Sequence, residues 1–447
     1  MSERPTKTNL RELAHAIGGD IMSRFTFATT KDTEELLVYQ DGVYNVGGET
    51  LVKQEVQDIA SPGDLGNNLV NEVLGNIKRS TYVDRSIFGG ANPHLVAQNC
   101  LLNVETMQPE PFSPNIYELA KLPVVYDPTK DCPAWKQFIS EVLSEEDVLG
   151  VQEELGAILR KKYLTKKFSI YLGETDTGKT TLINALLALL GKDNVSSVSM
   201  QQLGSRDRFA VAELYGKLAN IRDDLPKDVV DSVGKLKEIT GGFPVQAEHK
   251  FRDPFTFTNS AYLVFTCNNL PPVSEDDAAF FNRVQIRLFT RKYGGKADPD
   301  RELLTKLTTP DELSGILNWG LEGLTRLRNN GWNFSSTGSL DSTREDYKRR
   351  SDPVWAFVQD CLKEDSQGVV SKEKLYNLFR QWSLERGVPL LSKDGFYKAL
   401  PEKVHVESAY RTPPGERGRK HCFVGCVLNG ESPAQPAQPA PDQGSLP

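Results

Sequence analysis

The residues with the clearest chemical potential lie in the segment GETDTGKT, from Gly173 to Thr180. It fits the pattern G-x-x-x-x-G-K-[ST], in which backbone N–H groups surround a phosphate and the lysine reaches the β- and γ-phosphates. Thr180 supplies a hydroxyl that suits Mg²⁺. We therefore predict a site for ATP and Mg²⁺ at Gly173, Glu174, Thr175, Asp176, Thr177, Gly178, Lys179, Thr180 and Thr181.

The flanks of this segment, called here the glycine loop, favour the same interpretation. The apolar run 168–172 is typical of a buried strand, and residues 181–190 carry leucines at near-helical spacing before Gly191. The alternative, a glycine turn that happens to precede a helix, does not account for both flanks.

Two acids are the next candidates. Asp223 and Asp224 follow the short strand predicted over 218–221. A phosphate-loop ATPase needs one acid on the Mg²⁺ side and one that orients or deprotonates the attacking water. The alternative is a solvated acidic turn, which we consider weaker because the glycine loop lies in the same predicted domain.

An amide follows a third strand. The run 262–266 is β-branched and aromatic, as in a central strand, and Asn268 comes just after it. Its carboxamide can bond both a γ-phosphate and the attacking water, and so sense hydrolysis. The alternative is that Asn268 and Asn269 only form a turn.

A lone cation completes the catalytic candidates. Arg283 precedes the apolar strand 284–289 and has no obvious local partner in the sequence. Delivered to the ATP of a neighbouring subunit, it would stabilise the charge of the transition state. Arg287 is the rival candidate, and a surface salt bridge is the ordinary alternative.

Residues 240–257 are interpreted as a β-hairpin bounded by glycines and prolines, with His249, Lys250 and Arg252 near its exposed end. Such a hairpin can hold the phosphodiester backbone of DNA. The alternative is an ordinary charged hairpin.

The chain around these residues has an ordinary globular composition. Its 447 residues are 25% charged and 38% hydrophobic, with a net charge of −7, so a nucleic-acid surface has to be local. The N-terminus lacks an apolar signal core, and no run is long enough to span a membrane. We expect an intracellular protein of the host cytoplasm, with no membrane contact and with six unpaired cysteines.

The predicted fold class is α/β, with four segments. Residues 1–145 form a mixed α+β pre-motor domain, 146–335 the ATPase domain, 350–428 a small basic domain, and 429–447 a disordered Pro/Ala/Gln tail. In the first segment we expect strands at 36–39 and 42–46 and a helix at 68–77. An amphipathic helix within 126–143 should bury Trp135, Phe138, Ile139 and Val142.

The sequence of the small domain, residues 350–428, predicts a winged helix. Three helices, over 354–362, 374–384 and 395–400, precede strands at 404–410 and 422–428. From 348 to 428 there are 15 Lys and Arg against 10 Asp and Glu, which favours a nucleic-acid surface. His421, Cys422 and Cys426 can be metal ligands, but strand alternation explains them better.

The order of these motifs resembles the phage and plasmid primase-helicase family, superfamily 3 helicases that include the poxvirus helicase-primase. The resemblance covers about 30–428 and rests on YDPTKDCPAWKQF, YLGETDTGKTTL, GKLANIRDDLP, TGGFPVQAEHKF and FTCNNLPPVSEDDAAFFNRV. It implies an AAA+-like P-loop ATPase core in a hexameric ring and a C-terminal winged helix.

The resemblance also implies residue roles. The glycine loop binds ATP, Asp223 is the Mg²⁺-side acid, Asp224 activates water and Asn268 is the sensor. Arg283 acts in trans.

The same resemblance makes His249 and Lys250 the DNA contacts. Members of this family often carry a primase domain ahead of the ATPase domain. This chain starts almost directly at the region that precedes the ATPase domain, so we expect no primer synthesis and allow for a separate primase partner.

We therefore predict an ATP-dependent DNA helicase for a phage, virus or plasmid. The alternatives are a non-unwinding ATP-binding initiator or assembly protein, and a P-loop kinase.

Overall fold

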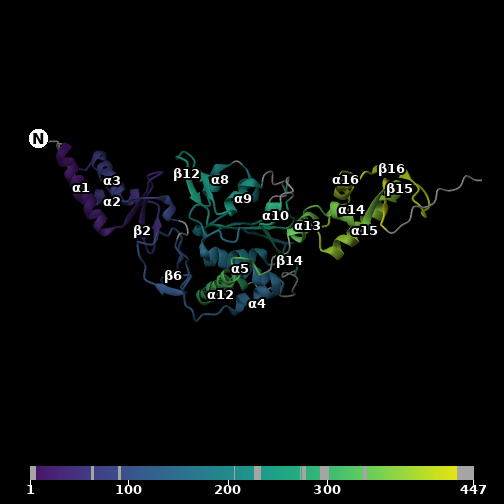
Figure 1. The fold of residues 1–447 in the computed structure, drawn as a ribbon, viewed down its shortest axis with the longest axis horizontal. Coiled ribbons are helices and arrows are strands. Elements are labelled where there is room, and N and C mark those ends of the chain that lie inside the picture. Colours follow the sequence, from purple (N-terminus) through teal and green to yellow (C-terminus); the bar gives the residue numbers. More distant parts are fainter. Residues whose placement is uncertain are drawn as a thin grey trace, which may run out of the picture. The chain divides into compact units, whose positions relative to one another are not determined.

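The computed structural model describes residues 7–61, 65–88, 92–205, 207–225, 233–271, 273, 278–291, 302–335 and 340–429. The chain divides into two compact units, Met1–Leu340 and Asp341–Pro447. They contain the mixed α/β structure that the sequence predicts (Figure 1). The tail predicted for 429–447 lies outside the described residues from 430 onward.

The first unit begins with a helical and β-stranded region. A four-stranded sheet in the order β3-β2-β1-β4 packs with helices whose apolar residues form its core. The strands expected at 36–39 and 42–46 and the helix expected at 68–77 are all present. The elements are α1 (Lys7–Arg24), β1 (Phe27–Thr30), β2 (Leu36–Gln40), β3 (Val43–Asn45), α2 (Gly48–Ile59), α3 (Asn67–Ser80) and β4 (Tyr82–Val83).

A short connecting region follows. It contains an antiparallel sheet in the order β5-β6-β7. The elements are η1 (Arg85–Ile87), β5 (His94–Val96), β6 (Leu101–Asn103) and β7 (Gln108–Glu110).

Two helices then lead into the central sheet. In α4 (Pro133–Val142) the four predicted apolar residues are all buried, and α5 (Glu145–Arg160) is capped by the Ser144 side chain. Helix α12 (Pro310–Asn329) packs against α5, and Figure 1 shows both on one side of the sheet, opposite α9 (Gly234–Thr240).

The central sheet is parallel throughout, in the order β14-β8-β13-β10-β9. Its middle strands β8 and β13 are almost entirely buried, as expected for a parallel sheet covered on both faces. The strands are β8 (Phe168–Gly173), β9 (Val195–Ser196), β10 (Ala219–Arg222), β13 (Tyr262–Cys267) and β14 (Val284–Phe289).

Shorter elements connect these strands. The hairpin predicted within 240–257 is present as β11 (Pro244–Ala247) paired antiparallel with β12 (Phe255–Thr258). The helices are α6 (Lys179–Leu190), η2 (Lys192–Asn194), α7 (Met200–Gly204), α8 (Arg208–Ala212), α9 (Gly234–Thr240), α10 (Ala278–Phe281) and α11 (Leu303–Leu307).

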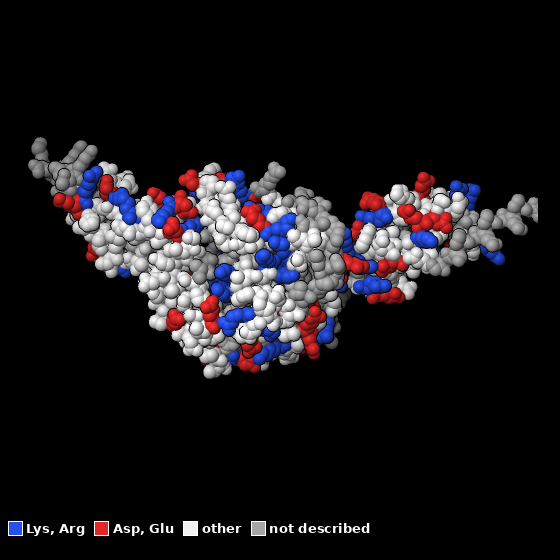
Figure 2. Space-filling model, in the orientation of Figure 1, with Lys and Arg blue, Asp and Glu red and all other residues white. Residues whose placement is uncertain are grey.

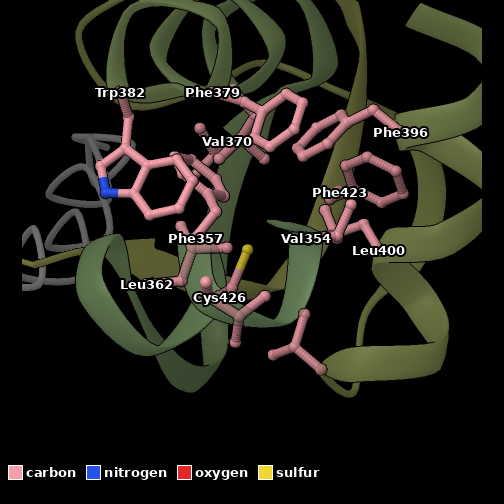
Figure 3. Close-up of a cluster of buried hydrophobic side chains, with 14 residues drawn as sticks. Val354, Phe357, Leu362, Val370, Phe379, Trp382, Phe396, Leu400, Phe423 and Cys426 are labelled. Atoms are coloured by element: carbon pink, nitrogen blue, oxygen red, sulfur yellow. The ribbon is translucent and has the colours of Figure 1, made fainter. Parts of the chain in front are cut away.

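The second unit has its own aromatic core, in which the Phe379 and Phe396 rings stack with centroids 4.5 Å apart (Figure 3). One of its strands, β15, was not predicted from the sequence; it pairs with β17 in the antiparallel sheet β15-β17-β16. The elements are α13 (Leu340–Ser351), α14 (Pro353–Cys361), β15 (Leu362–Ser371), α15 (Lys372–Arg386), α16 (Lys393–Lys403), β16 (Glu407–Arg411) and β17 (Lys420–Leu428).

Within the described residues, no helix combines the length and the apolar character needed to cross a membrane. On the face drawn in Figure 2, acidic and basic side chains are interspersed over both units. Any nucleic-acid surface has to be identified from particular residues, because the net charge of −7 gives no such indication.

Candidate functional site

Three neighbouring strands end at the same edge of the central sheet. Strand β13 lies between β8 and β10, and all three run parallel. The glycine loop follows β8, Asp223 and Asp224 follow β10, and Asn268 follows β13. Parallel strands therefore bring these polar residues to one edge, although they lie far apart in the sequence.

The loop requires glycine at positions 173 and 178. Gly178 has a φ of 92°, and a Cβ there would lie 2.8 Å from Val142 Cγ1 of α4. A Cβ on Gly173 would lie 2.4 Å from the Phe289 carbonyl oxygen of β14. Helix α4 and strand β14 thus pack against the loop. Helix α6 begins directly after Gly178, at Lys179.

Lys179 is held by the loop itself. Its Nζ donates to the carbonyl oxygens of Gly173 and Glu174, both at 2.6 Å. Thr177 Oγ1 and Asn268 Oδ1 each lie 3.3 Å away. An ammonium has three N–H donors for these four acceptors, so the two longer bonds compete for one proton. Burial lowers the pKa of Lys179, against the opposing charges of the nearby aspartates.

The two acids share a buried threonine. The Thr266 hydroxyl donates to Asp223 Oδ1 and accepts from the Asp224 N–H at 3.1 Å. Asp224 has a φ of 53°, in the left-handed region that non-glycine residues seldom adopt. Strain of this kind is common where a side chain is aimed at a ligand.

Thr266 was not predicted from the sequence to belong to the site. One signal was available, because Thr266 lies two residues before Asn268 and side chains at that spacing share a face of a strand. Between them lies Cys267, whose burial raises its thiol pKa to about 12. That thiol is therefore protonated at neutral pH.

A cavity of about 280 Å³ is enclosed by these residues, close to the size of small-molecule sites in proteins. Of the residues predicted to bind ATP, Gly173 and Glu174 do not line it; their carbonyl groups accept hydrogen bonds from Lys179. The lining consists of Thr175, Asp176, Thr177, Gly178, Lys179, Thr180, Thr181, Asp223, Asp224, Thr266, Cys267 and Asn268.

The donors in this cavity suit Mg²⁺. Thr180 and Asp223 offer the hard oxygen ligands that this ion prefers. In the part of the chain that the structure describes, no group of three His, Cys, Asp or Glu side chains could hold a metal ion. A magnesium ion here would need phosphate oxygens and water as further ligands.

Arg283 lies away from this cavity. Residues 284–289 of β14 pair in register with 168–173 of β8, so Arg283 precedes β14 at the opposite edge of the sheet. At about 3.3 Å per residue it is roughly 20 Å from Gly173 along the strand direction. The expectation that it has no local partner is wrong: its guanidinium donates to Thr240 Oγ1 at 3.1 Å and to the Ala279 carbonyl at 2.6 Å.

The rival, Arg287, is a core residue. Only 3% of it is exposed, and its Nε donates to Glu154 Oε1 at 2.7 Å. Asp147 lies 3.7 Å from its Nη1. An arginine enclosed by two carboxylates of its own chain is not available to a neighbouring subunit.

The cationic hairpin, β11 and β12 with residues 248–254 between them, also lies apart from the cavity, because β12 leads into the amino end of β13. Lys250 is exposed at its turn, and the His249 ring stacks on Phe255 with centroids 5.2 Å apart. Arg252 pairs with Glu35 of the N-terminal region at 3.1 Å.

The same N-terminal region supports the hairpin strand. The Arg85 guanidinium lies 4.6 Å from the centre of the Phe255 ring. Asp32 holds Arg85 through two hydrogen bonds, of 2.6 and 3.0 Å.

Comparison with known families gives three matches along the chain. Residues 67–144 match the model "D5 N terminal like", 171–283 match a family of unknown function (DUF5906), and 349–416 match "Poxvirus D5 protein-like". The first and last matches confirm the resemblance predicted from the sequence. None of the curated proteins matches the chain.

Among solved structures, the A form apo structure of NrS-1 C terminal region has a TM-score of 0.50 at 12% identity, over 92% of this chain and 99% of that one. A second A form structure has a TM-score of 0.49 at 13% identity, over 92% and 98%. A further apo structure has a TM-score of 0.47 at 13% identity, over 92% and 99%. At this identity the likeness concerns the fold alone.

Proposed function

We propose, from the similarity of this chain to the phage and plasmid primase-helicase family, that it is an ATP-dependent DNA helicase of a replication system. One observation carries the proposal. Lys179, Asp223, Asp224 and Asn268 line a single cavity next to the glycine loop. These are the groups that phosphoryl transfer to water requires.

Lys179 acts as the phosphate-binding cation. Its short bonds to two loop carbonyls keep the ammonium at the N-terminus of α6. Thr177 and Asn268 compete for the third N–H donor, so that donor is easily redirected. A γ-phosphate oxygen, being charged, replaces the weaker acceptors.

The remaining polar groups divide between the ion and the water. Thr180 and Asp223 would hold Mg²⁺, which neutralises phosphate charge when bound. Asp224, in its left-handed conformation, accepts a proton from the attacking water. Asn268, already within reach of Lys179, changes partner when the γ-phosphate leaves and thus senses hydrolysis.

Arg283 serves the ATP of a neighbouring subunit. At roughly 20 Å along the strand direction from its own glycine loop, it is too far to act in cis. Its bonds to Thr240 and to the Ala279 carbonyl hold the guanidinium in position. This arrangement supports a ring of subunits, and the family resemblance implies a hexamer.

DNA contacts Lys250 and His249 in the channel of that ring. The cationic hairpin leads into β13, whose other end carries Asn268, so one strand connects the nucleotide and the DNA contacts. The AAA+-like character of the ATPase core and the winged-helix character of the second unit belong to the same proposal.

Two rival functions remain testable. A P-loop kinase would transfer phosphate to a small acceptor and show no response to DNA. An ATP-binding assembly protein would release no phosphate at all. We therefore expect phosphate release that single-stranded DNA accelerates, together with a ring mass in the presence of nucleotide. Phosphate release that DNA leaves unchanged would contradict the helicase.

A further inference from the structure

We propose that the hairpin of the second unit binds single-stranded DNA, with the Tyr410–His421 pair stacking on an unpaired base and surrounding cations contacting phosphates. This C-terminal hairpin consists of β16, β17 and residues 412–419 between them. The site differs from the cationic hairpin of the first unit, and it requires no ATP hydrolysis.

The aromatic pair is unusually open. Tyr410 and His421 lie directly opposite each other across β16 and β17. Their rings are stacked, with centroids 4.9 Å apart and planes 3° from parallel. Tyr410 is nevertheless 66% exposed, so the stack covers little of its surface. An exposed, preformed aromatic platform is what an unpaired base can stack on, because every base offers a π-face.

The cations of the C-terminal hairpin lie close enough to repel one another. Arg411 and Lys420 form the next cross-strand pair, where like charges directly opposite each other are destabilising. Lys420 pairs with Glu416 at 2.6 Å. Two further exposed cations, Arg417 and Arg419, lie in the connecting loop. A bound phosphate backbone would relieve this repulsion.

A buried lysine lies on the same face as the aromatic pair. Phe423 is two residues after His421 on β17, so the two side chains share a face about 7 Å apart. The Lys372 ammonium lies 4.5 Å from the centre of the Phe423 ring and 5.3 Å from that of Tyr397.

Lys372 is only 8% exposed, and it has no ion pair or hydrogen bond from its side chain to another described residue. Burial lowers its pKa. Among the described residues the Lys372 ammonium contacts ring faces and no carboxylate, and a phosphate beside the hairpin would supply the counter-charge.

These observations favour DNA with unpaired bases over a duplex. Cations alone would serve either form, but a stacked ring pair gains contact only where a base is free. An acidic protein would use the cations and leave the platform unused.

The test measures binding of the full-length protein, without nucleotide, to a fluorescent thirty-residue oligothymidylate and to a blunt duplex of equal length. Replacing Arg417 and Arg419 together by Gln should weaken binding and reduce the salt slope by about 1.4, since each phosphate contact on a single strand contributes about 0.7. The matched control replaces Lys363 and Arg380, exposed cations elsewhere in the unit, by Gln and should change neither.

Tyr410→Ala should weaken oligothymidylate binding by between about fivefold and a hundredfold, with the salt slope unchanged. Tyr410→Trp, which keeps a ring, should retain the affinity. Cross-linking with 4-thiothymidine should attach the oligonucleotide to residues 407–421.

Equal losses in the Arg417/Arg419 variant and its control would overturn the proposal, as would absence of the cross-link. A Tyr410→Ala loss as large on the duplex as on the single strand would overturn the stacking role. Because no ATP is present, these results are independent of whether the protein is a helicase.

Discussion

Replacing Thr266 by Val tests the geometry of the candidate site at a residue that was not predicted from the sequence to belong to it. The side chain is 1% exposed, and Val has nearly the same shape, so the change removes one hydroxyl without opening a cavity. The lost interactions are the bond to Asp223 Oδ1 and the bond from the Asp224 N–H.

The expected effect on stability is small. The Asp224 N–H keeps a second acceptor, Asp223 Oδ1 at 3.1 Å, and Asp223 is exposed to water. We expect a cost of about 1 kcal/mol in the free energy of unfolding. Folded proteins typically have a free energy of unfolding of about 5–15 kcal/mol, so the variant should stay folded after that loss.

The expected effect on activity is larger. Removing a partner that orients an ion-binding carboxylate typically costs about 10- to 100-fold in metal affinity or activity. The assay is phosphate release as a function of Mg²⁺ concentration, with thermal unfolding measured in parallel. Thr266→Ser keeps the hydroxyl and should retain activity. Full activity of the Val variant at every Mg²⁺ concentration would refute the proposed coupling of Thr266 to Asp223.

Three further predictions concern the cations. Lys250→Ala should abolish DNA unwinding and DNA-stimulated hydrolysis; unwinding at the parental rate would exclude the cationic hairpin. Mixing an Arg283→Ala variant with a Lys179→Ala variant should restore some phosphate release at mixed interfaces, and no rescue at any ratio would exclude action in trans. Arg287→Ala should lower the free energy of unfolding by about 3–5 kcal/mol, because it leaves Glu154 as an unpaired buried charge; denaturant titration giving less than 1 kcal/mol would contradict this.

Most strands of the first unit were predictable because their apolar runs are short and bounded by turn residues. Strand β15 was not, since its residues 363–367, KEDSQ, are polar and mostly exposed and lack the alternation that marks a strand. It forms because β17 offers a partner edge, which is a tertiary effect.

Those residues of the candidate site that directly follow a strand could be predicted from the sequence. The glycine loop, the aspartates and Asn268 each follow an apolar run, and parallel strands bring such ends together. Thr266 was missed because it lies within a strand, where a threonine is ordinarily structural.

The hydrogen bond of Arg283 to Thr240 was also missed. Thr240 lies 43 residues away in the sequence, at the end of α9, and no local pattern indicates that contact.

The most direct test of the central claim is the rate of phosphate release from Mg²⁺·ATP by the Lys179→Ala variant beside the unaltered protein, both with single-stranded DNA present. If the cavity at the carboxyl edge of the sheet binds and hydrolyses ATP, the unaltered protein turns over and the variant does not. Equal turnover by the two proteins would contradict the account.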